Sequence, residues 1–349
     1  MTSNSTGAIV VGVDGSPPSL HAVDWAAREA AARHRPLRIV HAFRWPLTNE
    51  LMGPPAVGPP DAGLQHAAER MLSAAADRAR AAAPTVTVST DLPAEVPAAA
   101  LIDASDGADL LVVGHRGLGG FTGLLVGSVG VQTAAHAACP VIVIRASDSD
   151  DGHGRTEAGP AAGQVVVGVD NSDVSSPAVD FAFAHAARHG LGVVAVHAYQ
   201  RAAAGSDAQD EVRARMVTDA LAGYRDTYPH VPVREKLIHG RPAAVLAAES
   251  AGAALTVVGT RGRGGFTGLL LGSTSQGVLH HASSPVAIVR AHPTRRGGAA
   301  GTGARPNAPD TDDVAVAGPP EGTGPTAWPH ASPSGSTASR TSGSRSQPG

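Results

Sequence analysis

The sequence predicts an α/β protein made of two tandem doubly wound domains, each with a five-stranded parallel sheet, followed by a disordered C-terminal tail. Three observations lead to this prediction: the length, the composition and an internal repeat. At 349 residues the chain is longer than a single hydrophobic core usually spans. Hydrophobic residues make up 42% but aromatic residues only 3%, so Ala, Val, Leu and Ile must fill the interior. Such cores suit parallel sheets covered by Ala-rich helices.

The repeat divides the chain into two domains. VVGVDGS at 10–16 returns as VVGVDNS at 166–172, an offset of 156 residues, and GHRGLGGFTGLLVGS at 114–128 returns as GTRGRGGFTGLLLGS at 259–273, an offset of 145. The difference of 11 residues is a deletion in the second copy, opposite a Pro/Gly-rich surface loop at 46–63 of the first. The predicted parts are domain one (1–146), a flexible linker rich in Ser, Asp and Gly (147–163), domain two (164–291) and a disordered Gly/Pro/Ser-rich tail (292–349).

Within each copy, short β-branched runs alternate with longer Ala-rich amphipathic stretches. This alternation is typical of βαβ units, whose right-handed crossovers produce a parallel sheet. In chain order, the first copy is expected to form strand 9–13, helix 18–34, strand 37–43, helix 64–83, strand 86–91, helix 97–106, strand 110–114, helix 128–138 and strand 141–145. The second copy repeats this order from 165 to 290.

A Gly-rich segment follows the fourth apolar run of each copy, LLVVG in the first and LTVVG in the second. Ligands of open α/β sheets bind outside the carboxyl ends of the strands, which is where these segments lie. Gly114 and Gly117 permit tight turning, and Gly127 and Ser128 open the next helix with a serine at its cap. Such a helix start presents amide N–H groups and a hydroxyl to an anion. The second copy repeats the pattern at Gly259, Gly262, Gly272 and Ser273.

The phosphate-binding chemistry must do without a P-loop lysine. The only lysine is Lys236, so no Walker A motif exists in the chain. Phosphate charge is expected to be met by the amides of the two segments, by the Ser128 and Ser273 hydroxyls, by Arg116 and Arg261, and by Mg²⁺. A purely structural loop is the alternative for each segment, and the occurrence of the motif in both copies favours binding.

Two further positions in each copy are expected to face the same crevice. Asp14 and Asp170 end the first strands and can accept hydrogen bonds from adenine or ribose, with an N-cap or Asx-turn as the alternative role. At the ends of the second strands, Ala42 and Ala198 offer small residues whose backbone suits adenine recognition. The adjacent histidines, 41 and 197, are expected to be packed strand-end side chains and not catalysts.

These residues resemble the universal stress protein family, whose nucleotide-binding members carry G-x2-G-x9-G-[ST] after the fourth strand and an Asp after the first. The resemblance covers residues 9–145 and 165–290, and the chain is similar to the tandem actinobacterial type of the family. It implies sheet order 3-2-1-4-5, an adenine nucleotide alpha hydrolase-like fold, and one ATP in each domain. The nucleotide-binding residues expected are Gly12, Val13, Asp14, Ala42, Gly114, Arg116, Gly117, Gly127, Ser128 and Val129, and Gly168, Val169, Asp170, Ala198, Gly259, Arg261, Gly262, Gly272, Ser273 and Thr274.

The resemblance also implies a partner arrangement. Family members pair through their last strands, so 141–145 and 286–290 are expected to make an intramolecular pseudo-dimer, and a homodimer stays open. The copies differ at two places: Glu95 and Val96 stand where copy two has GR at 240–241, and Gly15 stands where copy two has Asn171. These differences could make the two nucleotide affinities unequal.

The function expected is that of a nucleotide-dependent stress-response regulator that binds ATP, with Mg²⁺, in both domains. One alternative is a slow ATPase or another ATP-using enzyme. No catalytic residue is predicted, because the sequence has no SGGxDS loop, no HxGH pattern and no paired carboxylates. The other alternative is an interaction scaffold whose crevices are vestigial.

Charge, hydropathy and cysteine content exclude several other classes. A net charge of −3, with 27 basic and 30 acidic residues, gives no field that would favour nucleic acid. No stretch approaches a membrane span, and a single cysteine fits a reducing compartment, so a cytoplasmic protein is expected. Cys139 is expected to be a small buried residue. No metal site is predicted, because His280 and His281 would point about 100° apart on a helix.

Overall fold

The computed structural model describes residues 7–42, 62–117, 126–145, 163–170, 176–200, 207–260 and 271–290. The chain divides into two units, residues 1–294 and 295–349, and the second lies outside the described residues. The predicted tail, and the predicted linker up to residue 162, therefore also lie outside them. No described helix combines the length and the apolar character that crossing a membrane requires.

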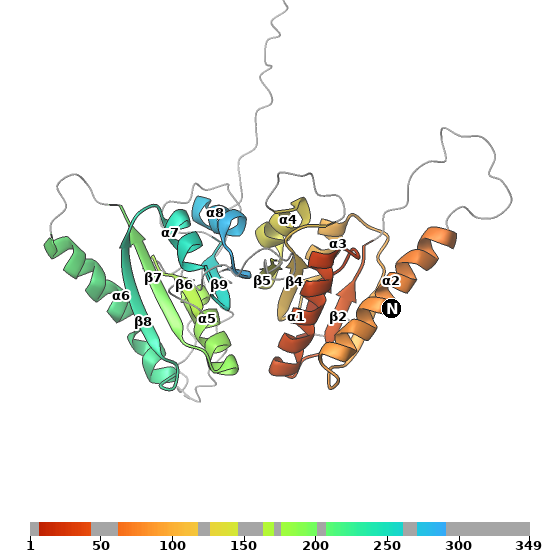
Figure 1. The fold of residues 1–349 in the computed structure, drawn as a ribbon, viewed down its shortest axis with the longest axis horizontal. Helices are drawn as coiled ribbons and strands as arrows, with labels where there is room; N and C mark the ends of the chain where they lie inside the picture. The colour runs from red at the N-terminus through yellow and green to blue at the C-terminus, as the bar shows by residue number, and fades with distance from the viewer. Residues whose placement is uncertain are drawn as a thin grey trace, which may run out of the picture. The chain divides into compact units, whose positions relative to one another are not determined.

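Strands and helices alternate through both halves of the first unit (Figure 1). The first half consists of β1 (Ile9–Gly12), α1 (Pro17–Arg33), β2 (Leu37–Val40), α2 (Ala62–Ala82), β3 (Val88–Asp91), α3 (Pro97–Ala104), β4 (Leu110–Gly114), α4 (Ser128–His136) and β5 (Val141–Ile144). The second consists of β6 (Val165–Gly168), α5 (Ser176–His189), β7 (Val193–Tyr199), α6 (Asp207–Thr227), β8 (Val233–His239), α7 (Pro242–Glu249), β9 (Leu255–Gly259), α8 (Ser273–His281) and β10 (Val286–Val289). The predicted elements are confirmed, with differences confined to their ends, which are the least determined part of any helix or strand.

The sheet has the predicted strand order in each half. The full order is β3-β2-β1-β4-β5-β10-β9-β6-β7-β8, which is 3-2-1-4-5 read from either end. Neighbouring strands within a half are parallel, whereas β5 and β10 pair antiparallel, with Val286 opposite Val143 and Ile288 opposite Val141. The two five-stranded sheets thus join through the strands that would otherwise be exposed edges.

Two hydrophobic cores cover the two faces of the sheet. Successive residues of a strand point to opposite faces, so Ile9 and Val11 of β1 pack with α1 and α2, whereas Val10 packs with α3 and α4. Helix α1 packs through alanines, including Ala22 and Ala26, which are fully buried. Because these side chains are small, the helix lies close to the sheet.

Close packing brings the start of α1 to the carboxyl end of β4. A Cβ atom on Gly114 would lie 2.8 Å from the carbonyl carbon of Pro18 and 2.9 Å from the amide nitrogen of Ser19. Only glycine fits between strand and helix at this separation, because the neighbouring atoms belong to the backbone and cannot rotate away.

Candidate functional site

A cavity of about 490 Å³ opens at the carboxyl ends of β1, β2 and β4 and at the start of α4. It lies where the strand order reverses between β1 and β4, the usual ligand position in an open α/β sheet. Every nucleotide-binding position expected in the first half lines it: Gly12, Val13, Asp14, Ala42, Gly114, Arg116, Gly117, Gly127, Ser128 and Val129. The volume falls within the range of small-molecule sites.

Sequence reasoning missed the apolar wall of this cavity. Pro97 and Leu101 of α3 line it, together with Val40 and Val113 at the strand ends. Leu101 also packs on Gly12, whose added Cβ would lie 2.7 Å from a Leu101 methyl carbon. The sequence of this segment, PAAALIDA, predicts a helix but carries no binding motif. Its contact with the site arises from the way the crossover helix packs on the sheet.

The two ends of the Gly-rich segment are tied together by backbone hydrogen bonds. The amide of His115 donates to the carbonyl of Ile144 (2.8 Å), and the amide of Gly127 donates to the carbonyl of His115 (2.8 Å). The expected serine cap is wrong by one residue: Gly127 is the N-cap of α4, and Ser128 is its first helical residue. Because Gly127 has no side chain, no side-chain hydrogen bond caps the helix. The first-turn amides therefore keep their capacity to bind an anion.

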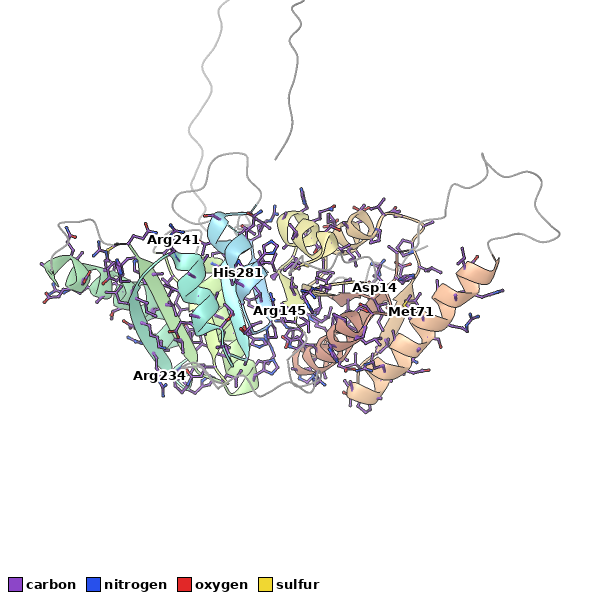
Figure 2. The ribbon with its side chains drawn as sticks, turned by 45° about the horizontal axis from the view of Figure 1, so that its top comes forward. Asp14, Met71, Arg145, Arg234, Arg241 and His281 are labelled. Atoms are coloured by element: carbon purple, nitrogen blue, oxygen red, sulfur yellow. The ribbon has the colours of Figure 1, made fainter. Side chains whose placement is uncertain are left out.

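Asp14 forms the Asx-turn that was one of its two expected roles, and it also lines the cavity. Its Oδ1 accepts hydrogen bonds from the backbone amide of Ser16 (3.0 Å) and from the Ser16 hydroxyl (2.6 Å), so it forms an Asx-turn. The N-cap of α1 is Ser16, whose side chain accepts from the Ser19 amide. Asp14 also lines the cavity, and an added Cβ on Gly117 would lie 2.2 Å from its Oδ2. The carboxylate is therefore held in place against the Gly-rich segment; it is labelled in Figure 2.

The strand-end histidines make the same contact in both halves. His41 donates through Nδ1 to the carbonyl of Val13 (2.7 Å), and His197 donates through Nδ1 to the carbonyl of Val169 (2.7 Å). The imidazole must be the donor because a carbonyl oxygen only accepts. Both contacts hold the end of the second strand against the end of the first, which supports the interpretation of these histidines as packed strand-end side chains.

Arg116 carries the permanent positive charge among the described residues that line the cavity. Its neighbour His115 is half-buried, and burial lowers the pKa of its imidazole, with the charges of Arg145 and Arg116 lowering it further. At neutral pH His115 is therefore held uncharged. Anionic groups in this cavity would meet one guanidinium, the helix start and backbone amides.

The second half repeats the described part of this geometry. Gly272 is the N-cap of α8, with φ −70° and ψ 157° against −71° and 156° for Gly127, and its amide donates to the carbonyl of Thr260 (2.8 Å). The remaining expected positions lie at the matching strand and helix ends: Gly168, Val169, Asp170, Ala198, Gly259, Ser273 and Thr274. Arg261 and Gly262 lie outside the described residues.

Two differences between the halves fall beside the sites. Ser275 donates to the carbonyl of Gly259 (2.6 Å), at the place where the first half has Gly130, a residue that lines the cavity. Val96 and Arg241 are the N-caps of α3 and α7, and neither makes a side-chain capping bond. The other expected difference cannot be compared, since Asn171 lies outside the described residues.

Cys139 lies outside the cavity and is buried, as expected. Burial raises the pKa of its thiol to about 12, so almost no thiolate exists at neutral pH. We expect alkylation of the native protein by iodoacetamide at pH 8 to be at least about a thousandfold slower than alkylation of the unfolded chain. Mass spectrometry of timed samples measures both rates. Equal rates would contradict a buried, protonated thiol.

Sequence reasoning also missed a cluster away from the cavity. Glu29 on α1 lies beside His185 and His189 on α5, with one ligand-type atom from each residue within 4.8 Å of the others. The spacing H-x3-H in HAARH was a usable signal, because residues four apart share one face of a helix. The acidic partner could not be found from the sequence, since it comes from the other half. The ring centroids of His280 and His281, the adjacent histidines for which the sequence predicts no metal site, lie 6.4 Å apart.

Comparison with known proteins identifies relatives over most of the chain. The model of the Universal stress protein family matches residues 6–145 and 162–290. A universal stress protein of Mycobacterium tuberculosis is 37% identical over 302 residues, which cover 83% of this chain and 98% of that protein. The crystal structure of a universal stress protein from Archaeoglobus fulgidus is 20% identical to this chain, with a TM-score of 0.60. The match covers 82% of this chain and 98% of the Archaeoglobus chain. A universal stress protein solved in complex with cAMP is 34% identical, with a TM-score of 0.31. The match covers 40% of this chain and 98% of the chain in that structure.

Proposed function

Because this chain belongs to the universal stress protein family, we propose that each of its halves binds one ATP with Mg²⁺ and that nucleotide occupancy regulates a stress response. The observation that carries the proposal is the cavity of the first half. The residues that the sequence motifs predict come from four separate segments, and all of them line this one cavity. The cavity lies where an open α/β sheet holds its ligand. The described part of the second half has the same backbone geometry.

The lining suggests where each part of the nucleotide lies. Adenine suits the apolar end, between Ala42 and the side chains of Pro97 and Leu101, with Asp14 within reach of the ribose or the base. The phosphates suit the Gly-rich part of the lining, formed by Gly114, Gly117 and the start of α4. A triphosphate carries more negative charge than Arg116 alone can balance, and Mg²⁺ bound to its oxygens supplies the remainder.

The cavity favours binding over rapid chemistry. Among the described lining residues the only carboxylate is Asp14, and its Oδ1 is already hydrogen-bonded to Ser16. A general base must reach a water or hydroxyl beside the γ-phosphate, and no second carboxylate lines the described cavity to do so. A regulatory role, in which ATP shifts an equilibrium between conformations, fits this lining better than an ATP-using enzyme.

Titration calorimetry tests the proposal. We expect two equivalents of ATP to bind the full chain in the presence of Mg²⁺, with weaker binding when Mg²⁺ is removed. AMP, cAMP and GTP serve as competitors that report which part of the nucleotide is recognised. The proposal fails if no heat of binding is detected with millimolar ATP on folded protein.

The two halves are proposed to act as an intramolecular pseudo-dimer. The pairing of β5 with β10 supports this arrangement, and so do two matching arginine contacts. Arg145 at the end of β5 donates to the carbonyls of Leu279 and His280 in α8, and Arg290 at the end of β10 donates to the carbonyl of Ala135 in α4. Each cation thus meets the carbonyl end of a helix of the other half, where positive charge is favoured; Figure 2 labels Arg145. Through these contacts, occupancy of one site could be transmitted to the other.

A further inference from the structure

The helices α1 and α5 are equivalent elements of the two halves, yet they differ in the side chains that meet between them. Glu29 and His185 are 156 residues apart, which is the offset between the repeated first strands, and the same offset relates Arg33 to His189. One half therefore offers a carboxylate and a guanidinium where the other offers two imidazoles. The difference makes the contact between the halves chemically complementary.

The three side chains converge at short distances. Oε2 of Glu29 lies 2.8 Å from Nε2 of His189, and Oε1 of Glu29 lies 3.5 Å from Nδ1 of His185. The two imidazoles are four residues apart on α5, and their ring centroids are 4.3 Å apart. Both rings thus face one carboxylate from the same side of the helix.

One of these buried atoms has no hydrogen bond within the described residues. Glu29 is 2% exposed and His185 is 5% exposed, and within the described residues Nδ1 of His185 has no hydrogen-bond partner. A buried nitrogen without a hydrogen bond is costly and rare in folded proteins. A metal ion beside this lone pair would satisfy it. The side chain of His189, 30% exposed, leaves a path by which an ion and water can enter.

Opposing effects act on the pKa values of Glu29 and His185. Burial alone would raise the pKa of Glu29, but the nearby imidazoles of His185 and His189 and the guanidinium of Arg33 lower it well below its ordinary value. Burial lowers the pKa of His185 more than the neighbouring carboxylate raises it. Metal ions bind the ionised form of a carboxyl group and the neutral form of an imidazole.

We propose that Glu29, His185 and His189 bind one divalent transition-metal ion, best matched by Zn²⁺, at the contact between α1 and α5. Two imidazoles and one carboxylate are an established zinc ligand set, with water in the fourth position. Zinc bonds of about 2.0–2.1 Å place tetrahedral ligand atoms roughly 3.3 Å apart. One ligand-type atom of each residue already lies within 4.8 Å of the others, and Oε2 of Glu29 and Nε2 of His189 must move apart from 2.8 Å as the ion replaces the proton between them.

The surroundings hold the ligands in place. Arg33 donates through Nε to Oε1 of Glu29 (2.5 Å), which leaves Oε2 for the ion. Trp25 and Phe181 lie nearly parallel to the ring of His185, at interplanar angles of 12° and 7°, and fix its orientation. Such supporting contacts are typical of metal centres. The nearby guanidinium of Arg188, 3.6 Å from Glu29, weakens the attraction for a cation, so we expect micromolar rather than tighter binding.

The test uses the full-length chain without an affinity tag, stripped of metal by a chelator and titrated with ZnCl₂. Equilibrium dialysis with elemental analysis is expected to show one Zn²⁺ per chain. His189→Ala, at a partly exposed position, is expected to weaken this binding at least about 100-fold. His66→Ala, a change at an exposed histidine of α2, is the matched control and should bind as the wild type does. Binding that His189→Ala leaves unchanged, or no saturable binding by the wild type, would overturn the proposal.

X-ray absorption of the zinc-loaded wild type gives a second test that does not depend on a folded variant. We expect two imidazole ligands and oxygen ligands in the first coordination shell. A shell made only of oxygen, or one with a single imidazole, would place the ion elsewhere on the protein and overturn the proposal. ATP titration of the stripped protein is a separate measurement, so failure of the metal site and failure of the nucleotide sites can be told apart.

Discussion

Gly117→Ala is expected to weaken ATP binding in the first half about 10- to 100-fold while the second half still binds. The new Cβ would lie 2.2 Å from Oδ2 of Asp14. The carboxylate cannot simply rotate away, because its Oδ1 is held by the amide and the hydroxyl of Ser16. Either the Gly-rich segment or Asp14 must move, and forcing a methyl group into a filled space costs about 1–3 kcal/mol. Nucleotide binding requires the original positions of these groups, so this cost is subtracted from the binding free energy and gives the expected loss of affinity.

Calorimetry of the Gly117→Ala variant measures this effect as a change from two tight sites to one. Gly223→Ala is the control, because Gly223 lies in α6 and its added Cβ would meet nothing within 4 Å. The control should keep both sites. Two unchanged sites in Gly117→Ala would mean that the Gly-rich segment and Asp14 do not hold the nucleotide.

Glu29→Ala is expected to lower the free energy of unfolding by about 3–5 kcal/mol, because the change leaves buried positive charge without its partner. Glu29 has contacts with Arg33 on its own helix α1 and, across the interface, with Arg188 and His189 on α5. Its side chain is almost fully buried and those of its partners are only partly exposed, so water screens the remaining charges incompletely. Denaturant unfolding at neutral pH, with a chelator present, measures the loss without a contribution from metal.

Asp77→Ala is the matched control for this prediction. Asp77 also pairs with an arginine, Arg80, at 2.8 Å, but both side chains are mostly exposed. Exposed pairs contribute little, so this change should shift stability by less than about 0.5 kcal/mol. Equal effects of the two substitutions would show that the Glu29 cluster is not a buried ion-pair network.

The fold could be predicted almost entirely from the sequence, because local patterns determine most of it. Runs such as IVVG and LLVVG are too short and too β-branched for helices, and the Ala-rich stretches between them are amphipathic. The repeat offset then fixed the second half. Helix ends were less predictable. The N-cap of α4 is Gly127 and not the expected Ser128, because glycine can take the extended N-cap conformation without a side-chain contact.

The residues of the candidate site that belong to sequence motifs were predictable, and the others were not. Gly114, Gly117 and Asp14 belong to recognisable patterns, whereas Leu101 contacts the cavity only because a crossover helix folds back over the sheet. The cluster at Glu29 illustrates the larger limit. Glu29 is separated from the two histidines by more than 150 residues, and no local pattern connects a glutamate on one helix with histidines on another. Contacts between the halves depend on the joining of β5 and β10, which periodicity does not predict.

The central claim is that each half holds one adenine nucleotide in the crevice at the carboxyl ends of its strands. A crystal structure of the full chain grown with Mg²⁺ and a non-hydrolysable ATP analogue tests it most directly. We expect phosphate density against the backbone of Gly114 and Gly127 in the first half, and against Gly259 and Gly272 in the second. Well-ordered crevices that stay empty at saturating analogue, or a nucleotide bound elsewhere, would contradict it.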